Sequence, residues 1–132
     1  MRGVDTNVLV RYITDDDPEQ SRVARTLIEG AEDEGVRLYI NSIVLCELCW
    51  TLRGKQYRYD RPTIAAALEK MFEVKIFEIE NRDLVARATR EYRLGRADFA
   101  DYLIGLSNDR AGCADTISFD GGLETLTEFT VL

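Results

Sequence analysis

Histidine is absent from this sequence of 132 residues, and its absence excludes several kinds of chemistry. The chain can form no Ser-His-Asp or Cys-His nucleophilic site, has no histidine general base and offers zinc no histidine ligand. No apolar run approaches the roughly 20 residues of a membrane-spanning helix. The charged start Met1–Asp5 is also unlike a signal peptide, so we expect no membrane partner. Chemistry must then depend on carboxylates, hydroxyls, thiols, basic groups or a bound metal.

Cysteine and proline are scarce, with three cysteines and two prolines in the whole chain. An odd number of cysteines favours free thiols in a reducing cytoplasm over a disulfide framework. Cys46 and Cys49 form a C-x-x-C motif, but a zinc site needs four ligands and only Cys113 remains. We expect this pair to pack in an apolar helix, because a free cysteine behaves as a small hydrophobe. Without repeats or linker-like segments, residues 1–132 should form a single domain.

Basic residues are fewer than acidic ones: the chain has 17 lysines and arginines and 24 aspartates and glutamates, for a net charge of −7. That balance opposes binding to nucleic acid, because contacts to phosphates depend on basic groups. The argument reverses locally if several acids hold divalent cations, whose charge changes the field at the site. An acidic chain also suits a basic protein partner.

Short strand-like segments alternate with helical patterns along the chain. Strands are expected at residues 2–5, 36–40, 74–79, 116–119 and 129–132. Helices are expected at residues 8–13, from 18 to 30 or 35, from 42 to 54, from 62 onward, from 82 onward and at 99–110. This alternation is typical of α/β proteins. We predict a three-layer α/β/α fold with a central, mostly parallel sheet of four to five strands.

Five acidic residues should lie near the edge of the sheet where its strands end. Asp5 and Asp120 follow expected strands, whereas Glu47, Asp98 and Asp101 lie in the first turns of expected helices. Each has a simpler explanation alone, such as a helix cap at Asp98 or a turn at Asp120. Glu47 and Asp101 have apolar neighbours in sequence, so we expect buried carboxylates that need a cation. Together these acids indicate an oxygen-ligand site for Mg²⁺ or Mn²⁺ at this edge.

Two basic segments complete the pattern. The first interleaves cations with tyrosines, which suits either an RNA-contacting loop or a solvated loop between helices. Its candidate RNA-contacting residues are Arg53, Lys55, Tyr57, Arg58, Tyr59 and Arg61. The second segment carries Arg87, Arg90, Arg93 and Arg96. We expect these four arginines to form an outward, solvated helix face.

Four segments, taken in order, make the chain resemble the PIN-domain ribonucleases, and among them the VapC-type toxins of toxin–antitoxin pairs. These segments are Val4–Leu9, Ser42–Leu48, Ala97–Ile104 and Cys113–Asp120. The resemblance extends over essentially the whole chain. It implies a PIN-like fold and a metal-dependent endoribonuclease.

The resemblance also implies a role for individual acidic residues. Asp5 and Asp101 would be direct metal ligands, and Glu47 would hold metal directly or through water. Asp120 would serve a second metal or act through water, with Asp98 as a further metal-binding residue close by. Small polar side chains would orient these acids, namely Thr6, Asn7 and Ser118.

The same resemblance implies a reaction and partners. One or two Mg²⁺ or Mn²⁺ ions would activate a water molecule that cleaves RNA, leaving a 5′-phosphate and a 3′-hydroxyl. A cognate antitoxin protein would cover the groove, often with a basic side chain in the acidic pocket, and the toxin would form a homodimer. The net charge of −7 suits such a basic segment.

Other functions remain as alternatives. A PIN fold that has lost activity could serve as a binding module. A haloacid-dehalogenase-like phosphatase also begins with an aspartate after its first strand, but it needs a second acid where this chain has Asn7. A receiver-like signalling domain needs paired acids there and a lysine near its last strand, and no lysine follows Lys75.

Overall fold

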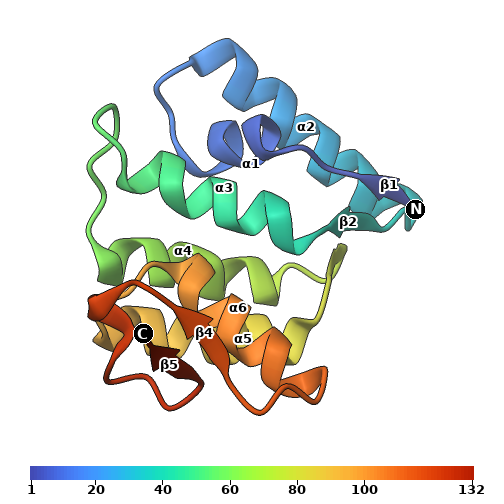
Figure 1. The fold of residues 1–132 in the computed structure, drawn as a ribbon. Coiled ribbons are helices and arrows are strands. Elements are labelled where there is room, and N and C mark those ends of the chain that lie inside the picture. Colours follow the sequence, from blue (N-terminus) through green and yellow to red (C-terminus); the bar gives the residue numbers. More distant parts are fainter. The chain divides into compact units, whose positions relative to one another are not determined.

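Six α-helices and five short strands make up the computed structural model, which describes all residues 1–132 (Figure 1). The chain divides into a first unit, Met1–Asn81, and a second unit, Arg82–Leu132. No helix is both long enough and apolar enough to cross a membrane.

The first unit contains a three-stranded parallel sheet and four helices. Its elements are β1 (Arg2–Gly3), α1 (Thr6–Ile13), α2 (Pro18–Glu34), β2 (Leu38–Ile40), α3 (Ser42–Arg53), α4 (Arg61–Glu73) and β3 (Phe77–Ile79). The strands are ordered β1-β2-β3, with Arg2 opposite Leu38 and Leu38 opposite Phe77. Helix α1 packs on α2 and α3, and α3 packs on α4. Because β1 and β2 are parallel neighbours, the helices that follow them, α1 and α3, begin at the same edge of the sheet.

Polar side chains start the helices of this unit. Asp5, Asp17, Asn41 and Asp60 each accept a hydrogen bond from a backbone N–H in the first turn of the helix that follows. These bonds satisfy donors that a helix start leaves unpaired. Helix α2 ends at Gly35, whose φ of 68° lies in the left-handed region that glycine adopts without strain.

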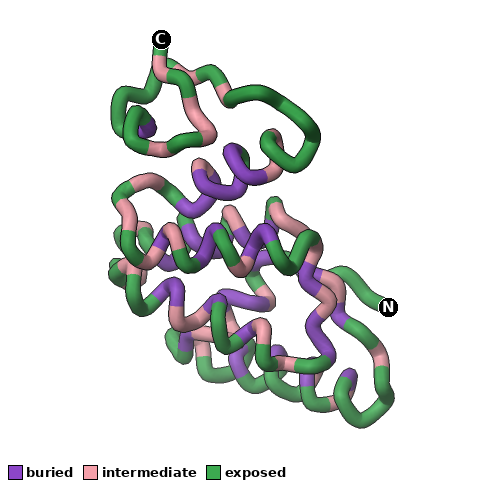
Figure 2. Tube along the Cα trace, turned by 90° about the horizontal axis from the view of Figure 1, so that it is seen from below, coloured by how far each residue is buried: buried purple, intermediate pink, exposed green.

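The core of the first unit is made of aliphatic side chains from its strands and helices, and these positions alternate with exposed ones along the chain (Figure 2). The largest fully buried side chains of this unit are Leu9, Leu38, Ile40, Leu45, Leu48, Leu52, Ile64, Leu68 and Met71. Each contributes about 1.5–3 kcal/mol relative to an exposed position. All three cysteines are free, and Cys49 is buried beside this leucine-rich face of α3 while Cys46 is half-buried.

The second unit pairs two helices with a two-stranded parallel sheet. Its elements are α5 (Arg82–Leu94), α6 (Phe99–Arg110), β4 (Thr116–Ser118), a short 3₁₀ helix η1 (Gly121–Leu123) and β5 (Phe129–Val131). Helices α5 and α6 pack together, with the rings of Tyr92 and Phe99 edge to face and 6.2 Å between their centroids. Gly112, just after α6, has a φ of 94° and turns the chain toward β4.

The α/β class and the parallel strands are confirmed, but the strands are shorter than expected and their hydrogen bonds form a three-stranded and a two-stranded sheet. Strand β1 stops at Gly3 because the chain turns at Asp5 to cap α1, which begins at Thr6 rather than Val8. Helix α4 likewise begins one residue early, at Arg61. Asn81, which directly precedes α5, has a φ of 49°, in the left-handed region rather than the extended conformation of a helix cap.

Candidate active site

In the first unit, helices α1 and α3 and the loop after α3 line a pocket of about 320 Å³, called here the first-unit pocket. It is lined by Asp5, Thr6, Asn7, Val10, Arg11, Glu47, Thr51, Gln56 and Tyr57. Five residues predicted from the sequence, in three separate segments, therefore line one pocket, namely Asp5, Thr6, Asn7, Glu47 and Tyr57. Their meeting follows from the parallel pairing of β1 and β2, which brings α1 and α3 to one edge.

Asp5 and Glu47 are the two carboxylates of the first-unit pocket. Asp5 is exposed, and its Oδ1 accepts a hydrogen bond from the Thr6 N–H at 2.7 Å. Glu47 is also exposed, which corrects the expectation of a buried carboxylate. Its neighbours Leu45 and Leu48 face the core, whereas the helical turn of about 100° per residue points Glu47 away from them.

Thr6 supplies an unsatisfied polar group in the same pocket. The residue is 9% exposed, and its buried hydroxyl oxygen has no hydrogen-bond partner in the chain. No other buried side-chain nitrogen or oxygen lacks a partner. Leaving such a group unpaired costs about 1–3 kcal/mol, which the rest of the fold offsets.

The second unit has a larger acidic pocket of about 700 Å³, called here the second-unit pocket. It is lined by Gly95, Arg96, Ala97, Asp98, Asp101, Tyr102, Asp120, Gly122, Leu123, Thr125 and Leu126. Three aspartates from the start of α6 and from the segment after β4 thus line one hollow. Arg96 is exposed, as expected, but it lies beyond the end of α5 and lines this pocket.

Asp101 has the most perturbed carboxyl group of the five candidate acids. Its partial burial raises its pKa above the ordinary 3.8, and the negative charges of Asp98 and Asp120 raise it further. The Asp98 N–H opposes this by donating to Asp101 Oδ2 at 3.1 Å. Two carboxylates of like charge beside a half-buried one are unfavourable without a cation, which is the environment expected of a metal ligand.

Hydrogen bonds within its own turn fix the position of Asp120. Its carboxylate Oδ1 accepts from the Gly122 N–H at 2.8 Å, and its own N–H donates to the Ser118 hydroxyl at 3.0 Å. Asp120 therefore caps η1 and also lines the second-unit pocket. Ser118 contributes by fixing the backbone at this aspartate.

The five acids thus fall into two groups, with Asp5 and Glu47 in the first unit and Asp98, Asp101 and Asp120 in the second. Within neither unit do three acidic or thiol side chains gather closely enough to hold a metal ion by themselves. Their roles as metal ligands remain predictions.

The basic segment 53–61 forms the connection between α3 and α4. Of its six candidate RNA-contacting residues, Tyr57 alone lines an acidic pocket. Its ring packs edge to face against Tyr59, with 6.1 Å between ring centroids. Arg53, Lys55 and Arg58 are exposed, whereas Tyr59 and Arg61 are half-buried.

Arg11 and Gln56 line the first-unit pocket although neither was selected from the sequence. Arg11 lies on α1 four residues after Asn7, so the two share a helix face. That four-residue spacing is the feature of the sequence that could have identified Arg11 as a pocket residue. Gln56 carries no comparable local signal, because its place depends on how the loop folds against α1.

The protein is therefore an α/β protein with parallel strands, and its candidate carboxylates line two pockets. The chain matches the PIN domain family model over residues 4–127, and it belongs to the PIN domain family. A VapC ribonuclease of Aquifex aeolicus (strain VF5) is 23% identical over 119 residues, which span 90% of this chain and 87% of that relative. The family expected from four short segments is therefore confirmed.

Proposed function

We propose that this PIN-domain protein is a VapC-type endoribonuclease that hydrolyses RNA phosphodiester bonds with Mg²⁺ or Mn²⁺. The observation that carries the proposal is the grouping of all five candidate acids at two pockets, together with the family. The name of the Aquifex aeolicus relative supports the same activity. We take Asp5, Glu47, Asp101 and Asp120 as the catalytic acids, serving one reaction, and residues 1–132 as one functional domain.

The pocket side chains fit a hard divalent cation. The two pockets offer carboxylates, the Thr6 hydroxyl and the Asn7 amide, and neither is lined by a cysteine. Oxygen donors of this kind favour Mg²⁺ or Mn²⁺ over zinc or copper. The metal-holding residues in this proposal are Asp5, Glu47, Asp98, Asp101 and Asp120. A divalent cation held there lowers the pKa of water and stabilises phosphoryl oxygens.

The chain's own groups prepare the site for that chemistry. The Thr6 N–H fixes one oxygen of Asp5, so the carboxylate is held at the start of α1 while its second oxygen has no partner in the chain. The Thr6 hydroxyl is buried and has no hydrogen-bond partner in the chain. A cation would stabilise the ionised form of Asp101, since the raised pKa of this carboxyl group reflects burial and neighbouring negative charge.

The proposed partners follow from the family rather than from a contact in this structure. We propose a cognate antitoxin protein with a basic segment, which the net charge of −7 suits, and a toxin homodimer. A catalytically inactive PIN binding module is the alternative, and an RNA cleavage assay separates the two.

The test is cleavage of total bacterial RNA by purified, antitoxin-free protein, with Mg²⁺ or Mn²⁺ and after chelation. Asp5→Asn and Asp101→Asn should each slow cleavage by about 100-fold or more, because metal-based stabilisation is worth several kcal/mol and each 1.36 kcal/mol is tenfold. Matched controls are Asp33→Asn on α2 and Asp109→Asn on α6, two exposed aspartates outside both pockets. The controls should cleave at the wild-type rate.

The outcomes separate the alternatives. Cleavage that stops on chelation, returns with added metal and is lost in both pocket variants supports the proposal. A folded protein that cleaves no class of RNA contradicts the enzyme and favours the binding module. Cleavage that survives chelation and both variants contradicts the assignment of these acids.

A further inference from the structure

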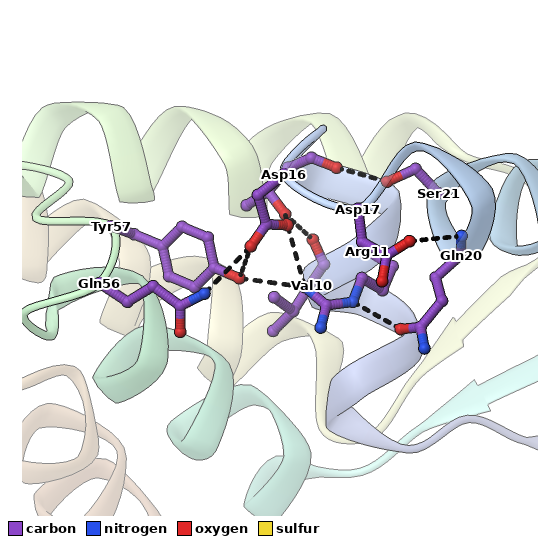
Figure 3. A network of polar contacts seen from close by, with 9 residues as sticks. Val10, Arg11, Asp16, Asp17, Gln20, Ser21, Gln56 and Tyr57 are labelled. Atoms are coloured by element: carbon purple, nitrogen blue, oxygen red, sulfur yellow. Dashed lines mark hydrogen bonds and ion pairs between the residues drawn. The ribbon is translucent and has the colours of Figure 1, made fainter.

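Asp16 is the centre of a polar network beside the first-unit pocket (Figure 3). Its carboxylate accepts hydrogen bonds from Tyr57 Oη at 2.7 Å, Thr14 Oγ1 at 2.8 Å, Arg11 Nη1 at 2.9 Å and Gln56 Nε2 at 3.1 Å. These donors hold the pKa of Asp16 to about 2, with the Tyr57 hydroxyl as the largest cause. The network joins α1, the segment before α2 and the loop after α3.

Arg11 is held in one orientation by this network. Its Nε donates to Gln20 Oε1 at 2.7 Å, and its Nη1 donates to Asp16 at 2.9 Å and to Tyr57 Oη at 3.2 Å. The remaining nitrogen, Nη2, has no hydrogen-bond partner in the chain. The guanidinium is therefore fixed on one side and has two donors left on the other.

The position of Arg11 distinguishes it from an ordinary surface ion pair. Its side chain is 26% exposed and lines the pocket that also holds Asp5 and Glu47. The same pocket contains the buried, unpaired hydroxyl of Thr6. A ligand with several oxygens would satisfy the free Arg11 donors.

A phosphate group is the ligand whose chemistry matches these donors. A guanidinium presents planar, paired N–H groups that fit phosphate oxygens, and its hydration is weak enough to be exchanged for such contacts. The ion pair with Asp16 fixes the orientation of the guanidinium, whose remaining N–H groups can then meet a phosphate.

We infer that Arg11 binds a backbone phosphate of the RNA substrate in the first-unit pocket, and that Asp16, Gln20 and Tyr57 are positioning residues for its guanidinium. This inference rests on the proposed function, because it names a substrate contact of that site. Arg11 then contributes to substrate binding, whereas the pocket acids serve the chemical step.

The test combines cleavage kinetics with binding of a short fluorescein-labelled single-stranded RNA in EDTA, where metal-dependent cleavage is prevented. Arg11→Gln should raise KM by about 10-fold or more, since hydrogen bonds to charged groups are strong, and should change kcat much less. It should also reduce the slope of log K against log salt by about 0.7, the loss of one phosphate contact to a single strand. Arg11→Lys should restore the slope but only part of the KM.

The Asp16→Asn variant distinguishes the positioning of the Arg11 guanidinium from its contact with phosphate. It keeps the charge of Arg11 but weakens its orientation, so KM should rise while the salt slope stays at the wild-type value. Arg25→Gln is the matched control, because Arg25 is an exposed arginine on α2 whose partner is Asp15. Its KM and slope should stay within about 2-fold of the wild type, as for most surface ion pairs.

Two results would overturn the inference. One is an Arg11→Gln variant with wild-type KM and salt slope. The other is a variant with lowered kcat and thermal stability but unchanged KM, which identifies the network as a structural clip. If the wild type cleaves no RNA, the proposed function fails instead, and the salt slopes measured in EDTA still decide whether Arg11 contacts phosphate.

Discussion

Gly95 allows Tyr102 to pack closely in the second unit, and alanine there should destabilise the fold. A β-carbon at position 95 would overlap the Tyr102 hydroxyl and would lie 2.9 Å from both Tyr102 Cζ and the Glu91 carbonyl oxygen. Tyr102 is 4% exposed, so its ring cannot move aside into solvent. Both Gly95 and Tyr102 line the second-unit pocket next to Asp101.

Two opposing effects determine how much Gly95→Ala changes the free energy of unfolding. Replacing glycine by alanine stabilises a compatible position by about 0.4–1 kcal/mol through the unfolded state. Overpacking a tight site costs about 1–3 kcal/mol. Because the overlap involves a buried ring and a backbone carbonyl, we expect overpacking to dominate, with a net loss of about 1–2 kcal/mol. For a domain of this length that loss lowers Tm by about 4–7 °C.

The assay is urea and thermal unfolding of Gly95→Ala, Tyr102→Phe and the double variant. Tyr102→Phe removes the atom that overlaps most, so Gly95→Ala should cost at least about 1 kcal/mol less in that background. Gly30→Ala on α2 is the control, because a β-carbon there meets nothing within 4 Å. That variant should gain stability. A Gly95→Ala variant as stable as the wild type, or with the same cost in both backgrounds, would refute the reasoning.

Three further predictions concern single groups. Because burial and like charge raise the pKa of Asp101, its ionised form destabilises the folded state, so Asp101→Asn should raise Tm at neutral pH; the gain should fade as pH falls toward the ordinary pKa of 3.8. Ser21→Ala should cost about 1–2 kcal/mol in urea unfolding, because the buried hydroxyl donates to the Thr14 carbonyl at 2.9 Å. A thiol reagent should label exposed Cys113 in the native protein but reach Cys49 only on unfolding, since burial raises the pKa of that thiol.

Each of these predictions has a clear counter-result. A Tm difference for Asp101→Asn that is equally large at pH 3 and pH 7 would exclude its titration as the cause. An unchanged unfolding free energy for Ser21→Ala would show that the hydroxyl bond adds nothing. Rapid native labelling of Cys49 would contradict its placement in the core.

Local sequence signals predicted most of the fold. Asp17 and Asn41 mark helix starts by capping chemistry, and Gly35 marks a helix end through its left-handed conformation. Such signals act within a few residues, so they are visible in the chain itself. The positions of Asp5 and Asp120 after strands could be predicted from the sequence for the same reason.

Features that depend on distant partners were not predictable. The hydrogen bond between Arg11 and Tyr57 joins residues 46 positions apart, and no spacing in the sequence indicates it. Strand pairing is also nonlocal, which is why the division into two hydrogen-bonded sheets was missed. Glu47 shows a different limit, because apolar sequence neighbours suggested burial, whereas helical geometry exposes it.

The most direct test of the central claim is whether Asp5 and Asp101, one from each pocket, serve the same metal-dependent reaction. Single-turnover RNA cleavage with Mn²⁺ should be measured for the wild type, Asp5→Asn, Asp101→Asn and the double variant. Residues that act as a unit are strongly non-additive, so the double variant should cleave about as slowly as the slower single variant. If the two losses multiply instead, or if either single variant retains the wild-type rate, the two acids do not share one active site.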